Sequence, residues 1–277
     1  MKKRYELNKR IINVELACMK VLVILLTGCS ANIADLNQDI NAISPDTPAN
    51  PATTMPVVIT STMPSTIMRA FEFQQRWINN VPCSPPCWEG VTPGATTSEQ
   101  AEEILNSNSI FTELETYVFD ELNIGYIDFR YFWLDDAGAI IECGGDMIFD
   151  NASDNHIIMV IRNSFPPTKL SDLITNFGRP SHVNAIYDDL RTPNSWEVNI
   201  IWMSKGLQMR ADGFYPYPSI DGNLELSRAE YFQPGLEGYA QGIGENWLGS
   251  LVEWQGYTDF NVYGISMWEI PTAESVP

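Results

Sequence analysis

The stretch YIDFRYFW, residues 126–133, alternates apolar and polar side chains. The apolar positions are Ile127, Phe129, Tyr131 and Trp133. Asp128 and Arg130 stand between them. Because successive side chains of a β-strand point to opposite faces, this period of two predicts a strand with one buried and one polar face.

Further strands are predicted on both sides of this stretch. On the basis of β-rich composition and bounding turn residues, they cover residues 112–119, 139–149, 156–162, 183–187, 196–203, 207–211 and 224–232. Residues 135–138 and 204–206 have the composition of tight turns. Gly144 and Gly145 predict a β-bulge within the strand that follows the first of these turns.

Each run of strands follows a predicted helix. The first helix begins with a capping box in which Thr96 caps and Glu99 reaches back, and its apolar positions are Ala101, Ile104 and Leu105. The second opens at residues 166–168, with apolar positions Leu170, Leu173, Ile174 and Phe177 at helical spacing. Gly178 and Pro180 mark its end.

These elements predict an α+β fold of two tandem modules, each a helix followed by an antiparallel β-meander. The modules cover residues 67–165 and 166–277, and the second carries a C-terminal extension with a short helix ending at Gly256 and a strand at 262–268. The two helices lie about 70 residues apart, as measured between matching apolar positions. Internal duplication and independent convergence on one layout both fit this period.

The charge is distributed unevenly along the chain. The 277 residues have a formal net charge of −19, with 16 basic and 35 acidic residues. The first 28 residues hold six of the basic and two of the acidic ones, so the remainder carries 10 against 33, or −23. A surface of this sign repels phosphate groups, which argues against nucleic-acid binding and against docking on anionic lipid.

The N-terminal segment VLVILLTGCS, residues 21–30, resembles a bacterial lipoprotein signal peptide with its lipobox. That resemblance implies cleavage before Cys29 and acylation of its thiol and new amino group. The apolar run is too short to span a bilayer, which takes about 20 residues. Glu15 and Lys20 interrupt it, so Met1 and Met19 are both candidate starts.

Residues 29–66 are rich in Pro, Thr, Ser, Asn and Ala and show no sustained period. Such a composition predicts a flexible tether that follows a signal peptide at 1–28. We therefore expect a protein held on the extracytoplasmic side of the cell membrane, with the lipid bilayer as a partner through acylated Cys29.

Three cysteines remain beyond the tether, namely Cys83, Cys87 and Cys143. Outside the cytoplasm a disulfide is expected, and prolines pre-bend the short CSPPC loop for a bridge between Cys83 and Cys87. A bridge from either of them to Cys143 is the alternative. Three thiols with two distant histidines do not have zinc spacing, and three residues between the cysteines depart from a redox motif. No metal or cofactor is expected.

Four tryptophans lie near predicted turns: Trp88, Trp247, Trp254 and Trp268. Aromatic faces at such positions can bind sugar rings, whereas core packing is the more common role of tryptophan. The two histidines stand in no Ser/His/Asp pattern, and no nucleophile-elbow motif occurs. The sequence thus predicts a protein that is not an enzyme.

The motif Cys-x-x-Pro-Cys-Trp-x-Gly-x-x-Pro-Gly-x-Thr-Thr, residues 83–97, resembles that of a group of uncharacterised bacterial envelope lipoproteins. This resemblance implies an extracytoplasmic location. At fold level, tandem helix-plus-meander modules are similar to small outer-membrane assembly lipoproteins and to the β-lactamase inhibitor protein, which present a sheet face to a protein partner. We therefore expect an envelope-protein partner or a role in envelope assembly. The alternative is glycan binding through exposed aromatics, and an enzyme with paired acids ranks third.

Overall fold

The computed structural model describes residues 70, 73, 76, 80–134, 138–188, 190 and 193–266. Its first half contains α3 (Ser98–Ser107), β1 (Phe111–Phe119), η1 (Asp120–Leu122), β2 (Ile124–Leu134), β3 (Ile140–Asp150), β4 (Ile158–Lys169) and α4 (Leu170–Phe177). Its second half contains β5 (His182–Asp188), β6 (Ser195–Trp202), η2 (Met203–Lys205), β7 (Leu207–Phe214), β8 (Ser219–Ile220), β9 (Glu225–Phe232), α5 (Leu236–Tyr239), η3 (Ala240–Gly244), η4 (Glu245–Ser250), β10 (Val252–Glu253), β11 (Thr258–Asp259), α6 (Phe260–Tyr263) and β12 (Gly264–Ser266).

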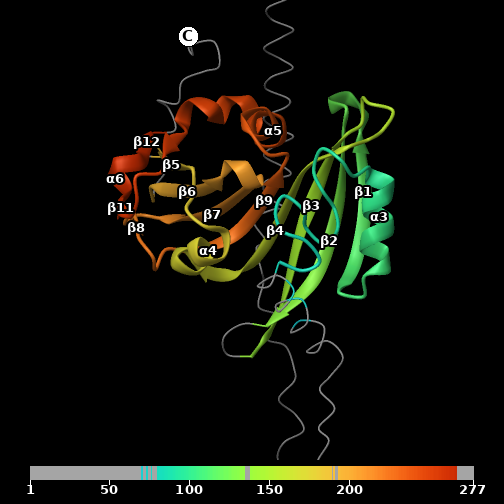
Figure 1. Ribbon diagram of the computed structural model, residues 1–277, viewed down its shortest axis with the longest axis horizontal. Helices are drawn as coiled ribbons and strands as arrows, with labels where there is room; N and C mark the ends of the chain where they lie inside the picture. Colours follow the sequence, from blue (N-terminus) through green and yellow to red (C-terminus); the bar gives the residue numbers. More distant parts are fainter. Residues whose placement is uncertain are drawn as a thin grey trace, which may run out of the picture.

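One mixed sheet of ten strands organises the described residues. Nine of them follow the order β1-β2-β3-β4-β9-β7-β6-β5-β10, and β12 pairs with β5 as the parallel member. Strands β8 and β11 form a small separate pair. In Figure 1 the sheet runs from β1, beside α3, through β4 and β9 to β5 at the opposite side.

The expected α+β fold of two tandem modules is wrong, because the described residues are mostly β and form one large mixed sheet. Strand β4 pairs with β3 along one edge and with β9 along the other, so the two runs of strands join into a single sheet. One hydrophobic core cluster includes Phe129 of β2 and Ile200 of β6. The expected boundary at residues 165 and 166 falls inside β4. The physical reason is that β4 leaves a row of backbone donors and acceptors on its free edge, and β9 satisfies them.

The expected bulge at Gly144 and Gly145 is also wrong. Strand β2 pairs with β3 in unbroken register through both glycines, and the register shift between β3 and β4 falls at Ile148 and Phe149, where Met159 of β4 is the extra residue. The glycines serve close packing instead. A Cβ on Gly145 would lie 2.0 Å from the backbone oxygen of Arg162 and 2.6 Å from the Phe129 ring.

Both helices begin later than expected. The capping box of α3 uses Thr97 and Gln100: the Thr97 hydroxyl accepts from the Gln100 backbone N–H at 3.2 Å, and Gln100 Oε1 accepts from the Thr97 backbone N–H at 3.1 Å. Residues 166–168 belong to β4, because Thr168 pairs with Leu226 of β9. Helix α4 therefore begins at Leu170, and Gly178 follows its last residue with φ +78°, as expected.

The C-terminal extension differs from the expected helix and strand. Short turns of helix, α5, η3 and η4, precede β10, and residues 260–266 form α6 and β12. Tyr239 of α5 packs on Ile201, Met203 and Phe232, in a second and smaller hydrophobic cluster. Figure 1 shows this helical segment arching over the ends of the strands in the second half of the sheet.

The cysteine loop, residues 83–94, is fastened at both ends. Cys83 and Cys87 are disulfide-bonded with their Cα atoms 5.6 Å apart, so neither bridges to Cys143. Downstream, the Gly94 N–H donates to the Ile158 carbonyl at 2.8 Å, at the start of β4. The loop is thus attached to the strand that joins the two halves of the sheet.

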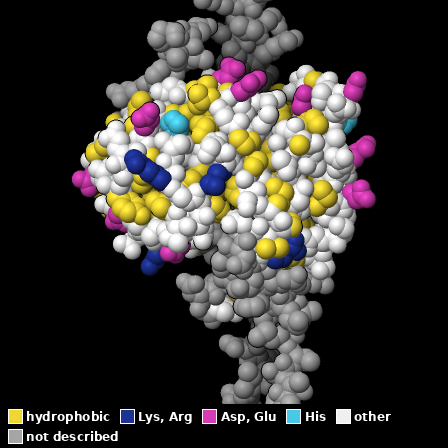
Figure 2. Space-filling view, viewed as in Figure 1, with side chains coloured by type: hydrophobic (Ala, Val, Ile, Leu, Met, Phe, Trp, Pro, Cys, Tyr) yellow, Lys and Arg dark blue, Asp and Glu magenta, His cyan; other side chains and the backbone are white. Residues whose placement is uncertain are grey.

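Acidic side chains lie along the rim of the face seen in Figure 2, with hydrophobic side chains scattered between them. Among the described residues, no helix has the length and apolar character needed to cross a membrane. The predicted signal segment, Cys29 and the predicted tether lie outside the described residues.

Candidate functional site

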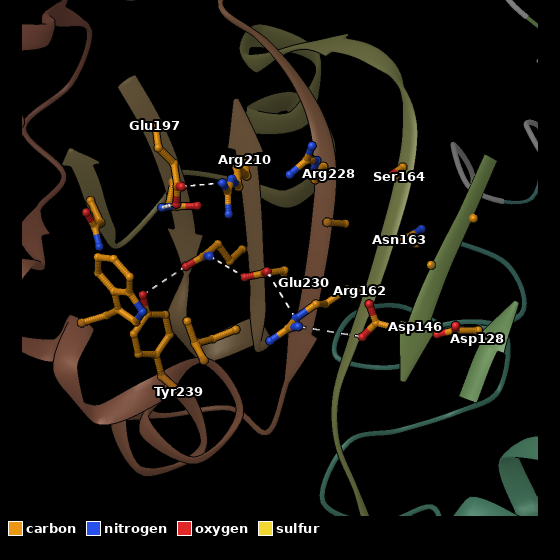
Figure 3. A pocket seen from close by; sticks show the side chains of 18 of the residues that line it. Asp128, Asp146, Arg162, Asn163, Ser164, Glu197, Arg210, Arg228, Glu230 and Tyr239 are labelled. Carbon is orange, nitrogen blue, oxygen red and sulfur yellow. Dashed lines mark hydrogen bonds and ion pairs between the residues drawn. The ribbon is translucent and has the colours of Figure 1, made fainter. Parts of the chain in front are cut away.

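A cavity of about 320 Å³ opens on the polar face of the sheet, beneath the segment α5–η4. Its floor contains side chains from seven strands, β2 to β7 and β9. Its roof contains Tyr239, Ile243 and Trp247. Figure 3 shows the charged side chains of these strands projecting into the same space.

Strand register arranges the floor in two rows. The first row, in order across the sheet, consists of Asp128, Asp146, Arg162, Glu230 and Gln208. The second row consists of Ser164, Arg228, Arg210, Asn199 and Asn184. Each residue in a row is the direct cross-strand partner of the next. Because residues two apart on a strand share a face, both rows point toward the roof.

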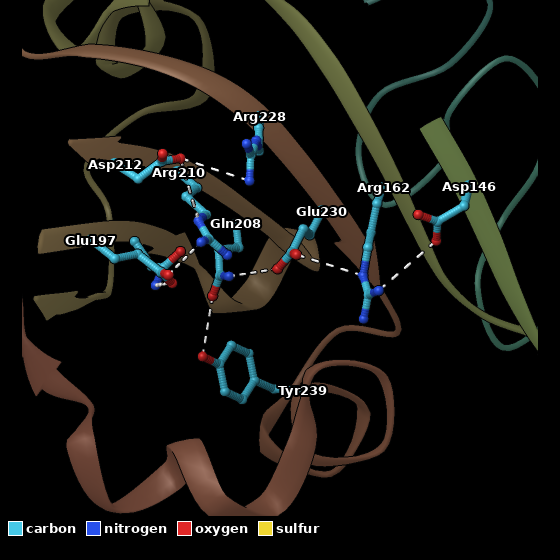
Figure 4. A network of polar contacts seen from close by, with 10 residues as sticks. Asp146, Arg162, Glu197, Gln208, Arg210, Asp212, Arg228, Glu230 and Tyr239 are labelled. Carbon is cyan, nitrogen blue, oxygen red and sulfur yellow. Dashed lines mark hydrogen bonds and ion pairs between the residues drawn. The ribbon is translucent and has the colours of Figure 1, made fainter. Parts of the chain in front are cut away.

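The first row forms a continuous polar chain beneath the roof (Figure 4). The Tyr239 hydroxyl donates to Gln208 Oε1 at 3.1 Å, and Gln208 Nε2 donates to Glu230 Oε2 at 2.6 Å. The Arg162 guanidinium then bridges two acids, with Nε 3.6 Å from Glu230 Oε1 and Nη1 3.9 Å from Asp146 Oδ1. Both of these ion-pair distances are longer than a hydrogen bond, so one cation serves two carboxylates loosely.

The arginines of the second row are neutralised by Glu197 of β6 and Asp212 of β7. Each acid lies two residues along its strand from a member of the row. Arg210 Nη2 lies 2.5 Å from Glu197 Oε2, whose other oxygen accepts from Asn199 Nδ2 at 2.7 Å. Asp212 Oδ1 is shared by Arg210 Nε at 3.8 Å and Arg228 Nη1 at 3.7 Å. The two arginines of this row therefore have two acidic partners.

Desolvation perturbs the carboxyl groups of the floor. Burial raises the pKa of Asp146 to about 6; the Arg162 charge opposes this rise, and Asp128 and Glu230 add to it. Burial likewise raises the pKa of Glu197 against the opposing effect of Arg210. Partial desolvation raises the pKa of Asp128 as well, although its side chain lies at the exposed end of the first row. A ligand that stabilises the ionised carboxylates would offset the free-energy cost of ionising these desolvated groups.

Three buried acceptors on the floor are left without a hydrogen bond. They are Oδ1 of Asp146, Asn184 and Asn199, and no donor among the described residues reaches any of them. Their side chains are 4 %, 1 % and 3 % exposed, respectively. Buried polar atoms are nearly always paired, and an unpaired one costs about 1–3 kcal/mol. The floor therefore has three buried acceptors without a donor in the described part of the chain, beside a buried donor, Arg210 Nε, without an acceptor within hydrogen-bond distance.

Like charges face each other directly in both rows. Asp128 is the cross-strand partner of Asp146, and Arg210 is the partner of Arg228. Such pairs destabilise a sheet, and departures from favourable pairing concentrate at functional sites. The like-charged pairs therefore indicate that the floor is a functional site, at some cost in the stability of the sheet.

No family model, curated protein or solved structure matches this chain. The resemblance to envelope lipoproteins accordingly stays a prediction, and the geometry of the cavity carries the functional argument.

Of the four tryptophans proposed for sugar binding, the three that the structure describes differ in their surroundings. Trp88 and Trp254 belong to the hydrophobic core, with 3 % and 7 % of their surface exposed. Trp247 is half-buried and lines the cavity. Trp268 lies outside the described residues. Among the described members of this set, only Trp247 therefore lines the cavity.

Sequence reasoning missed the floor of the cavity, although its signal was present. The alternation in the sequence indicates Asp128 and Arg130 as the polar face of a strand, and Arg210, Arg228 and Glu230 hold the same alternating position in later strands. Read one strand at a time, these residues indicate a solvated face. Within the described ranges, no three His, Cys, Asp or Glu side chains are grouped closely enough to hold a metal ion.

Proposed function

We propose that the protein is a lipid-anchored, non-enzymatic binding protein of the cell envelope that holds a small polar ligand in this cavity. The observation that carries the proposal is the set of three buried acceptors on Asp146, Asn184 and Asn199 without donors among the described residues. A ligand with N–H or O–H groups would complete their hydrogen bonds. The cavity is also of the size that small-molecule sites have, roughly 300–1,000 Å³.

The roof supports the same proposal. Trp247 supplies an apolar surface opposite the charged floor, and ligand pockets typically combine such a surface with a few fixed polar groups. The Ser250 hydroxyl donates to the Trp247 carbonyl at 2.8 Å and accepts from Asn184 Nδ2 at 3.0 Å. This link ties roof and floor together at one end of the cavity.

Ligand binding is testable by thermal unfolding of the full-length chain in detergent. The probes are four classes of small molecule: amines, neutral sugars, amino acids and carboxylates. A ligand at 100 times its Kd adds about 2.7 kcal/mol to the native state, which raises Tm by about 5–10 °C in a protein of this size. We expect at least one class to give such a shift, and Asn184→Leu to reduce it by more than half.

Asn184→Leu is a suitable variant because it removes an unpaired acceptor at nearly constant volume. Its partner Ser250 keeps the bond to the Trp247 carbonyl, so the free protein is expected to stay folded. Asn106→Leu, at an exposed position of α3, is the matched control and should leave the ligand shift unchanged. No Tm change with any probe class would contradict the proposed function.

The membrane anchor is a separate part of the proposal. It is supported by the apolar run that ends at Cys29 and by the tether composition that follows. With Cys29→Ser the sulfur needed for diacylglycerol transfer is lost, and we expect the protein to leave the membrane fraction and stop incorporating labelled palmitate. The control is Cys18→Ser, which leaves the lipobox intact. Equal membrane recovery of both variants would contradict the anchor.

The expected envelope-protein partner stays a prediction, and one surface suits it. Strand β1 lies at the end of the strand order and has the apolar side chains of Tyr117, Val118 and Phe119 exposed. An exposed edge strand can add a strand from another chain. A partner at this edge would leave the cavity open, since no residue of β1 lines it.

A further inference from the structure

We infer that the cavity binds a small organic amine, with an ammonium group seated on the carboxylates of Asp128 and Asp146. This inference rests on the proposed function and names the chemical class of its ligand. Amines that share this chemistry include diamines, polyamines and amino sugars.

The first row has a deficit of positive charge at its outer end. Asp128 and Asp146 are direct cross-strand partners, so their carboxylates face the same small volume. The cations near them are Arg130, two residues along the same strand as Asp128, and Arg162, which lies 3.9 Å from Asp146 and is shared with Glu230. Two arginines thus stand beside the three acids Asp128, Asp146 and Glu230, which leaves this part of the floor with a net charge of −1. An ammonium group would supply the missing charge.

The other end of the cavity also requires donors. Asn184 and Asn199 are cross-strand partners, and each has its amide nitrogen engaged and its oxygen unpaired. An oxygen of this kind accepts a hydrogen bond from a second amine, an amide N–H or a hydroxyl. Strands β3 and β6 are four strand spacings apart, about 4.8 Å each. A short amine on Asp128 and Asp146 therefore leaves these oxygens to a second donor group, which only a longer ligand such as a polyamine would carry.

Anions are a poorer match for this cavity. The arginines of the second row already have Glu197 and Asp212 as partners. The protein as a whole has a net charge of −19, which attracts cations and repels anions at long range. In the roof, Trp247 is linked through Ser250 to Asn184, so its indole can add a cation–π contact to a second ammonium group at that end of the cavity.

The inference is testable by calorimetric titration of the full-length chain in detergent. The probes are putrescine and glucosamine, each with an uncharged or anionic counterpart, N-acetylglucosamine and glutarate. We expect the two amines to bind and N-acetylation to weaken binding at least tenfold. Asp146→Asn is expected to weaken amine binding more than tenfold, whereas Asn106→Leu leaves it unchanged.

The pH profile gives a second readout that loss of folding would not mimic. The groups that face Asp146 are Asp128 from β2, Arg162 from β4 and Glu230 from β9. Because an ammonium ion requires the ionised carboxylate, affinity for putrescine should fall as pH drops below about 6. In Asp146→Asn that fall should be reduced.

Each outcome decides between the inference and the function on which it rests. If N-acetylglucosamine or glutarate binds as tightly as its amine counterpart, the amine assignment is overturned while the cavity remains a binding site. If none of the four probes and no other small-molecule class binds, both fail. Amine binding that survives Asp146→Asn unchanged would place the site elsewhere and overturn the inference.

Discussion

Replacement of Trp88 by alanine is expected to lower the free energy of unfolding by about 3–5 kcal/mol, as for other buried large-to-small changes. The Trp88 ring packs on Phe73, Phe111 and Phe129, with ring centroids 6.5, 5.6 and 4.8 Å away, respectively. Its backbone exchanges two hydrogen bonds with Val91, both of 2.9 Å. Removing the ring would leave the fastened cysteine loop over a void, because the disulfide and the Val91 pairing prevent collapse.

Denaturant unfolding of the full-length chain measures this effect. Trp88→Phe keeps an aromatic ring in the core and should cost much less than the alanine variant. The matched control is Trp196→Ala in β6, where the indole is half-buried and the expected loss is smaller. A loss below 1 kcal/mol for Trp88→Ala would contradict the role of this residue as the anchor of the loop.

Replacement of Asp146 by asparagine is expected to have the opposite sign and to stabilise the free protein by up to about 3 kcal/mol at pH 7.5. The pKa of this carboxyl is raised by burial from its ordinary value of 3.8 to about 6. Each pKa unit corresponds to about 1.36 kcal/mol between the two protonation states. Asparagine resembles the protonated form in shape and charge, so the variant avoids the cost of ionising a buried acid.

The pH dependence distinguishes this cause from a change in packing. Since the folded pKa lies above the unfolded value, the folded state holds more protons between about pH 4 and 6, and stability falls as pH rises through that window. The stabilising effect of Asp146→Asn should therefore be full above pH 6 and absent below pH 4. Glu103→Gln, on the exposed face of α3, removes one negative charge as a control. Equal stabilisation by both variants would point to net charge alone.

If the cavity binds amines, Asp146→Asn gains stability and loses affinity together. That combination is typical of a residue kept for binding at the expense of folding. It also distinguishes Asp146 from the core residues, because replacing a core residue would lower both the stability of the protein and its affinity for the ligand.

The local pattern predicted individual elements well and their assembly poorly. The alternation at residues 126–133 predicted β2, and the apolar spacing from Leu170 to Phe177 predicted α4. The pairing of β4 with β9 cannot be read from any local sequence pattern, because its partners, such as Val160 and Phe232, come from opposite halves of the chain. Residues 166–168 have helix-opening composition, yet they lie in β4: the ladder with β9 shifts register after Ser164 and resumes where Thr168 pairs with Leu226.

The cavity could not be predicted for the same reason. A polar residue at every second position indicates a solvated face until strand order is known. Only the register places Asp146 between Asp128 and Arg162, and only the C-terminal extension roofs the floor with Tyr239 and Trp247. The tryptophans near turns were ambiguous in the sequence, because a loop can direct an indole inward as Trp88 does.

The seam between β4 and β9 also has a consequence for the order of events during synthesis and folding. Strands β1 to β4 are complete long before β9 exists, so Val160 and Arg162 lie at an open edge until Phe232 and Glu230 of β9 are available to pair with them. Long-range pairing of this kind slows folding and exposes a template for intermolecular association. Truncation before residue 225 should therefore yield an aggregating fragment rather than a smaller folded domain.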